Sequence, residues 1–117
     1  MCGITGWVQY DGIAGNKDIY AMTEALGHRG PDQEQIWQGP IAQLGDRRLA
    51  VIDLIGGRQP MQKQRDQNNY VMVYNGELYN TEELRLALLQ RGYTFTTTSD
   101  TEVLLTAFIE WREHCVD

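Results

Sequence analysis

The sequence predicts an α+β fold or a layered αββα arrangement of strands and helices. Apolar or β-branched runs alternate with helix-periodic segments along the 117 residues, in the order strands, helix, strands, helix, strand, helix. Hydrophobic residues make up 42% of the chain and charged residues 22%, which is ordinary for a globular protein. A chain of this size buries about two-thirds of its unfolded surface, so we expect at most one small domain.

The first half of the chain is expected to be mostly extended. Residues 4–10 are apolar and end at the turn pair Asp11-Gly12, and Gly39-Pro40 separates two short extended runs. Ile19, Met22 and Leu26 recur at helical spacing before Gly27. The expected elements are a strand at residues 4–10, a helix at 17–26, a loop at 28–32, a hairpin of 35–38 and 41–44, and an extended run at 48–54.

The second half is expected to contain two longer helices. Thr81 can cap the first, Gly92 can stop it, and Leu84, Leu88 and Leu89 are expected to point inward. The expected elements are an exposed turn at residues 63–69, a buried strand at 70–74, a helix at 82–90, a short strand at 93–97 and a helix at 101–115.

The last helix carries two further signals. Ser99 and Glu102 have the spacing of a capping box. An apolar stripe follows, which predicts one helix face packed on a sheet or another helix. The stripe consists of Val103, Leu104, Ala107, Phe108 and Trp111.

Charge and cysteine content narrow the function classes. The net charge of −6 argues against nucleic acid or an acidic membrane as partner, and no apolar run approaches transmembrane length. No secretory leader precedes Cys2, so we expect a cytoplasmic protein in a reducing compartment. Two cysteines and two histidines without clustered spacing predict neither a disulfide framework nor a zinc site.

Cys2 is the first candidate for chemistry. Removal of Met1 would give one residue both a thiol nucleophile and an α-amine, whose usual pKa of about 7.7–8.0 suits a general base near neutral pH. The alternative is that the cysteine follows the initiator methionine, Met1, by chance.

A cysteine that cleaves an amide also needs an oxyanion hole, which the Asn75 side chain and the Gly76 N–H could supply. The alternative for Asn75-Gly76 is that the pair simply forms the turn of a β-hairpin.

Charged residues suit the two ends of an amino acid. Arg48 could bind a carboxylate with two parallel hydrogen bonds, although an ion pair with Asp46 or Asp53 would also explain it. Glu77 and Asp100 could bind an ammonium group, and helix capping is the alternative for Asp100. An arginine, two carboxylates and a thiol together fit an α-amino acid with an amide side chain.

Ordered motifs then indicate a family. They are Met1-Cys2-Gly3-Ile4, His28-Arg29-Gly30-Pro31-Asp32, Arg48-Leu49-Ala50-Val51-Ile52-Asp53, Gln59-Pro60-Met61, Asn75-Gly76-Glu77-Leu78-Tyr79-Asn80 and Ser99-Asp100-Thr101-Glu102-Val103. The chain resembles, end to end, the N-terminal glutaminase domain of glutamine-hydrolysing asparagine synthetases. These are class II, N-terminal-nucleophile glutamine amidotransferases, and the fold that the resemblance implies is their four-layer αββα sandwich.

The resemblance also implies roles for individual residues. Cys2 would form a γ-glutamyl thioester with its own α-amine as proton shuttle, and Asn75 and Gly76 would form the oxyanion hole. Arg48 would bind the α-carboxylate of L-glutamine, and Glu77 and Asp100 its α-ammonium. The backbone contacts would come from Leu49, Ala50, Val51 and Ile52. Residues 28–32 would form a loop near the site.

The chain also departs from the family. Asp46 stands where members often carry His, and no functional account of it emerges. The family's glutaminase domain continues into further strands and then an ATP-binding synthetase domain, so residues 1–117 are expected to be its N-terminal portion, incomplete at the C-terminal end. The chain itself would need no cofactor; ATP and magnesium are implied for the synthetase domain, the expected partner.

Two further readings of the function stay open. The chain could be the glutaminase domain of another class II amidotransferase, or an inactive or partner-dependent fragment. If missing strands expose the apolar stripe, we expect the isolated chain to self-associate as a homo-oligomer or to be partly folded, with little activity.

Overall fold

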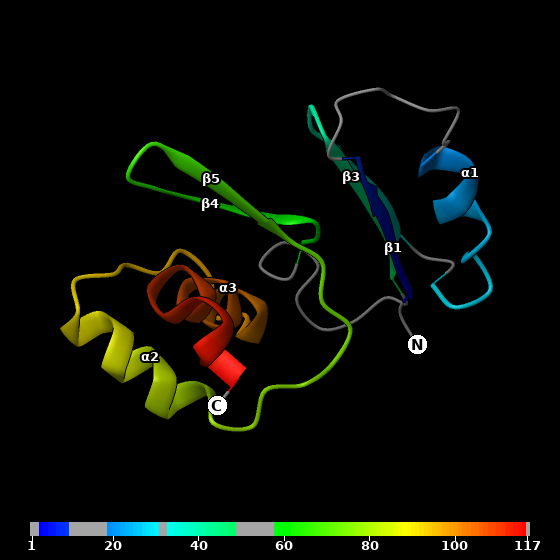
Figure 1. The fold of residues 1–117 in the computed structure, drawn as a ribbon. Helices are drawn as coiled ribbons and strands as arrows, with labels where there is room; N and C mark the ends of the chain where they lie inside the picture. The colour runs from blue at the N-terminus through cyan, green and yellow to red at the C-terminus, as the bar shows by residue number, and fades with distance from the viewer. Residues whose placement is uncertain (1–2, 10–18, 31–32, 49–57, 117) are drawn as a thin grey trace.

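Two antiparallel sheets and three α-helices make up the described part of the chain (Figure 1). The computed structural model describes residues 3–9, 19–30, 33–48 and 58–116, without the side chain of Arg48. The α+β class is confirmed. The elements are β1 Gly3–Val8, α1 Ile19–Glu24, β2 Gln33–Gln38, β3 Ala42–Arg48, β4 Met61–Arg65, β5 Asn68–Met72, α2 Thr81–Gln90, α3 Asp100–Trp111 and the 3-10 helix η1 Arg112–Val116.

The first sheet has the strand order β1-β3-β2. The predicted hairpin around Gly39-Pro40 is confirmed as β2 and β3, and the predicted strand at 4–10 as β1. The register pairs Gly3 with Arg47, so the start of β1 lies beside the end of β3. Of the extended run expected at 48–54, Arg48 ends β3 and the rest lies outside the described residues.

Helix α1 covers one face of this sheet (Figure 1). It ends at Glu24, before the predicted end at residue 26, because the chain from Ala25 onward forms turns; the predicted start at residues 17–18 lies outside the described residues. Thr23 is fully buried over the sheet, where a side-chain carbon added at Gly45 would clash with the Thr23 hydroxyl. Glycine at position 45 therefore allows the close approach of α1 to β3.

The second sheet is a hairpin that the sequence did not predict. Residues 63–69 were expected to form an exposed turn, but they lie within β4 and β5, and the turn is confined to Asp66 and Gln67. Both turn residues have positive φ, 52° and 68°, as in the two-residue turn that matches strand twist. The prediction of one long turn was wrong because the strands are polar, and β5 ends at Met72, before the predicted end at Tyr74.

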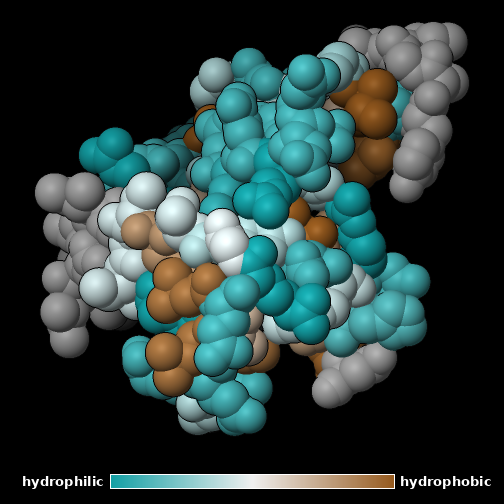
Figure 2. Space-filling view, turned by 90° about the vertical axis from the view of Figure 1, so that its left-hand side faces the viewer, coloured by the Kyte–Doolittle hydropathy of each residue, from teal (hydrophilic) through white to brown (hydrophobic). Residues whose placement is uncertain are grey.

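Helix α2 has leucine side chains on both its buried and its exposed side. Leu88 is fully buried as predicted, whereas Leu89 is 46% exposed and does not point inward. Asn80, not Thr81, is the N-cap residue, and the Thr81 hydroxyl donates instead to the carbonyl of Leu78 (2.7 Å). The predicted stop at Gly92 is confirmed by its φ of +93°. The side of the molecule with α2 and the hairpin turn is mainly hydrophilic with separate apolar patches (Figure 2).

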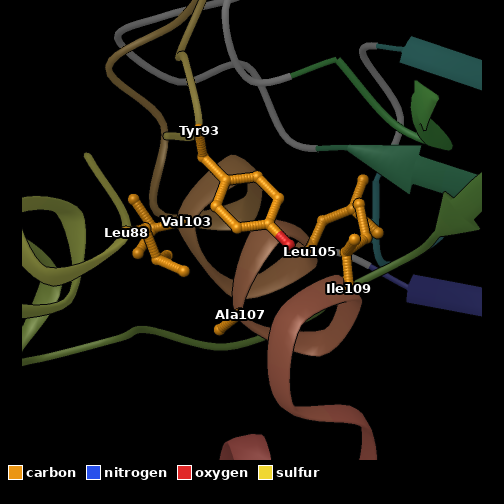
Figure 3. Close-up of a cluster of buried hydrophobic side chains, with 6 residues drawn as sticks. All are labelled: Leu88, Tyr93, Val103, Leu105, Ala107 and Ile109. Carbon is orange, nitrogen blue, oxygen red and sulfur yellow. The ribbon is translucent and has the colours of Figure 1, made fainter. Parts of the chain in front are cut away.

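Helix α3 is buried on more sides than the predicted stripe. Val103 and Ala107 are fully buried, but Phe108 is exposed, and the buried Leu105 and Ile109 lie outside the stripe. The prediction of one apolar face failed because α3 packs against both α2 and the β4–β5 hairpin. The core gathers around Tyr93 (Figure 3) and consists of Leu88, Tyr93, Val103, Leu105, Ala107 and Ile109.

Glu102 fixes the segment between α2 and α3. Ser99 is the N-cap of α3 and accepts a hydrogen bond from the Thr101 N–H, but Glu102 does not complete the predicted capping box. Its carboxylate instead accepts from the N–H groups of Thr96 and Thr97 and pairs with Lys63 at 3.2 Å. These contacts hold residues 93–97 as an irregular segment, so the short strand predicted there is not formed.

We expect Glu102→Gln to lower the free energy of unfolding by about 1.5–3 kcal/mol at pH 7, the usual loss for hydrogen bonds to a charged group. Burial raises the pKa of Glu102, but the hydrogen bonds from Thr97, Thr96 and Lys63 outweigh it and leave the pKa below its ordinary value. Ionised Glu102 therefore stabilises the fold above about pH 4.3, and this contribution is lost as pH falls through the lower folded pKa.

Urea unfolding of wild type and Glu102→Gln between pH 3 and 7 checks this expectation. The variant should show less loss of stability on acidification than wild type. Glu82→Gln, on the exposed side of α2, is the matched control and should lose no more than about 1 kcal/mol, the contribution of a carboxylate in the first turn of a helix. Equal stability of wild type and Glu102→Gln at pH 7 would contradict the assignment.

Candidate active site

The segment between β5 and α2 carries the predicted oxyanion residues. Asn75 and Gly76 follow β5 by a few residues and lie exposed in a loop that leads directly into α2. The hairpin alternative for this Asn-Gly pair is therefore excluded, because no return strand follows it. An exposed amide side chain next to a glycine N–H can reach a bound carbonyl oxygen.

Asp100 joins this loop to the start of α3. Its carboxylate oxygen Oδ2 accepts a hydrogen bond from the N–H of Leu78 at 3.2 Å. Ser99, rather than Asp100, is the N-cap residue of α3, but Asp100 lies in the first turn of the helix, where a carboxylate also suits the helix dipole. This hydrogen bond ties the start of α3 to the loop that contains Asn75 and Gly76.

The hydroxyl group of Tyr74 is affected by both predicted carboxylates. Burial raises the pKa of Tyr74, and the negative charges of Asp100 and Glu77 raise it further. The position of Asp100 agrees with this, because its carboxylate accepts from the N–H of Leu78, the residue that directly follows Glu77. Glu77 and Asp100 therefore belong to one electronegative patch. Such a patch is suited to an ammonium group.

Tyr74 also constrains the loop, and sequence reasoning missed this. A Cβ added at Gly76 would lie 2.9 Å from the Tyr74 hydroxyl oxygen, so a side chain there would force the tyrosine to move. In the sequence Tyr74 is simply the last residue of an apolar run before Asn75. Only the tertiary structure reveals that its ring returns over Gly76.

The remaining predicted residues lie at or beyond the limits of the described structure. Cys2 and residues 49–52 lie outside it, and of Arg48 only the backbone, at the end of β3, is described. Gly3, the residue after Cys2, is paired with Arg47, the residue before Arg48. The roles of Cys2, Arg48 and residues 49–52 stay predictions.

Asp46, the residue where the chain departs from the family, is a buried carboxylate in the first sheet. It is only 1% exposed and lies in the central strand β3, opposite Ile4 and Gln35. A buried carboxylate at the centre of a sheet is costly unless its surroundings compensate it.

Neither a metal centre nor a membrane segment is found in the described part of the chain. The residues with defined positions contain no group of three or more His, Cys, Asp or Glu side chains arranged to hold a metal ion. None of the helices in this part is both long and apolar enough to cross a bilayer.

Comparison with known sequences places the chain in a family. Residues 1–117, the whole chain, match the glutamine amidotransferase domain family. The chain belongs to this family. The glutamine amidotransferase domain is 50% identical over 119 residues to asparagine synthetase [glutamine-hydrolyzing] 3 of Bacillus subtilis, and 38% identical over 117 residues to asparagine synthetase [glutamine-hydrolyzing] 1 of the same organism.

A third relative is asparagine synthetase B [glutamine-hydrolyzing] of Escherichia coli, 36% identical over 112 residues. The three alignments cover 100%, 97% and 94% of the chain, but only 19%, 18% and 20% of the respective relatives. The glutamine amidotransferase domain thus spans about a fifth of the length of these relatives. Their names agree with the branch of the family that the motifs indicated.

Proposed function

We propose that this chain hydrolyses L-glutamine to L-glutamate and ammonia. The observation that carries the proposal is the exposed Asn75-Gly76 pair beside the patch formed by Glu77 and Asp100, in a member of the glutamine amidotransferase domain family. An amide-bond reaction needs oxyanion donors, and an α-amino acid substrate needs an ammonium site. Both requirements meet in this one loop.

In the proposed reaction Cys2 attacks the side-chain amide of glutamine. Its α-amine takes the thiol proton as the sulfur–carbon bond forms, and the developing oxyanion accepts hydrogen bonds from the Asn75 side chain and the Gly76 N–H. The α-amine then gives its proton to the departing nitrogen, and ammonia leaves. Water, deprotonated by the same amine, cleaves the thioester, which releases glutamate and restores the thiol.

The substrate ends are assigned to the charged residues. Arg48 binds the α-carboxylate, and the backbone of residues 49–52 runs along the substrate. Asp100 and Glu77 bind the α-ammonium. The hydrogen bond from the Leu78 N–H to Asp100, which holds Asp100 beside the residue that follows Glu77, supports the second assignment.

We further propose that residues 1–117 are the N-terminal portion of an N-terminal-nucleophile αββα sandwich. Helix α1 lies on one side of the first sheet, and α3 packs on the hairpin sheet (Figure 1), an order that supports this architecture. In a longer polypeptide, a synthetase domain with ATP and magnesium would use the ammonia to make asparagine from aspartate. The names of the relatives, which are asparagine synthetases, support this use of the ammonia.

Glutaminase kinetics with Asp100→Asn test the proposal. We expect wild type to form glutamate from glutamine, and the variant to raise KM about 10–100-fold with a smaller change in kcat. A charge-assisted hydrogen bond is worth about 1.5–3 kcal/mol, and 1.4 kcal/mol corresponds to tenfold in binding. The assay should use this chain and also any longer polypeptide in which it is produced.

Asp66→Asn is the matched control for Asp100→Asn. Asp66 lies exposed in the hairpin turn, and asparagine tolerates its positive φ, so KM should not change. Thermal unfolding of each variant separates binding from folding. An unchanged KM for Asp100→Asn with a lowered melting temperature would assign Asp100 to the fold alone.

A further inference from the structure

Gln59 makes two hydrogen bonds to the backbone of a single residue. Its amide Nε2 donates to the carbonyl oxygen of Tyr74 at 2.9 Å, and the Tyr74 N–H donates to Gln59 Oε1 at 2.6 Å. The glutamine is only 8% exposed. A side-chain amide that pairs in this way imitates the backbone of a neighbouring strand, because it presents one donor and one acceptor side by side.

This contact lies at the point where regular structure ends. Strand β5 stops at Met72, and α2 does not begin until Thr81. Tyr74 directly precedes Asn75 in this irregular segment. The two hydrogen bonds from Gln59 therefore fix the backbone immediately before the Asn75-Gly76 pair, where strand pairing no longer does so.

The same side chain reaches the other part of the site. Gln59 Nε2 also approaches the hydroxyl oxygen of Thr101 at 3.4 Å, and Thr101 directly follows Asp100. One buried amide thus contacts the neighbour of the oxyanion pair and the neighbour of the ammonium-binding carboxylate. The distance makes the Thr101 contact the weaker of the two.

We propose that Gln59 is a positioning residue for the glutaminase reaction, which holds the backbone before Asn75 so that the oxyanion donors keep their direction. This inference rests on the proposed function. Oxyanion stabilisation depends on donors placed within a few tenths of an ångström, so a loosened backbone lowers turnover more than ground-state binding. An amide side chain supplies, on two neighbouring terminal atoms, the donor and the acceptor that Tyr74 uses.

Gln59→Met tests the proposal, because methionine has a similar shape but neither hydrogen-bonding group. We expect kcat for glutamine to fall about 10–100-fold, with KM within about threefold of wild type. Gln59→Glu replaces the donor with a carboxylate oxygen that faces the Tyr74 carbonyl in a nearly buried site, so its kcat should fall at least as far as that of Gln59→Met. Gln64→Met, an exposed position on β4, is the matched control and should keep the wild-type kcat.

Amide hydrogen exchange gives a second readout that does not depend on activity. The N–H of Tyr74 should exchange at least tenfold faster in Gln59→Met, while amides in the middle of α3 keep their protection. Loss of protection throughout the chain, or unchanged exchange at Tyr74, would overturn the proposal. So would a lowered melting temperature with wild-type kcat.

The two proposals can fail separately. If wild type forms no glutamate, the proposed function fails, yet selective loss of protection at Tyr74 would still support the positioning of this backbone by Gln59. If wild type is active and Gln59→Met has wild-type kcat, the function stands and the positioning role is wrong.

Discussion

A chain that keeps Met1 should hydrolyse no glutamine, even when it is fully folded. With Met1 in place, the nitrogen of Cys2 belongs to a peptide bond and cannot take a proton. The proposed reaction then has a nucleophile without a base, because the mechanism assigns no other residue to that role. The expected effect is complete loss of turnover, which is larger than that of any substitution considered above.

The same protein provides its own control. Intact mass distinguishes chains with and without Met1, and treatment with a methionine aminopeptidase converts one form into the other without any mutation. Glutamate formation should rise in proportion to the fraction of chains that begin at Cys2. Turnover in material whose mass still includes Met1 throughout would refute the role of the α-amine.

The sequence predicted the elements whose signals are local. Gly39-Pro40 marks the β2–β3 hairpin, and Gly92 marks the end of α2, because turn and cap residues act on their own neighbours. The β4–β5 hairpin escaped prediction. Its polar Lys63 bonds Glu102, Thr106 and the carbonyl of Thr94, partners that lie 31 to 43 residues away in the sequence.

The candidate site also divides into residues with a local sequence signal and residues that depend on long-range contacts. Asn75, Gly76, Glu77 and Asp100 could be proposed from the sequence because motif and residue type together indicate a chemistry, and their roles stay predictions. The contribution of Gln59 could not be predicted, since it depends on a contact with Tyr74, 15 residues away. Long-range contacts of this kind leave no periodic or local pattern in the sequence.

Asn75→Ala should lower kcat for glutamine about 10²–10³-fold, the usual loss when one oxyanion donor is removed. KM should change little, because the Asn75 amide is proposed to bind an oxygen whose charge develops only in the transition state. Initial rates of glutamate formation over a range of glutamine concentrations separate the two parameters.

Asn80→Ala is the control for Asn75→Ala. Asn80 lies exposed in the same loop, and its side chain makes no capping hydrogen bond to α2, so its removal should leave kcat unchanged. Comparable losses in kcat for both variants would mean that the loop, and not the Asn75 amide, was disturbed. A loss that falls on KM alone would mean that Asn75 binds the ground-state amide, and the oxyanion hole would then have to rest on the Gly76 N–H.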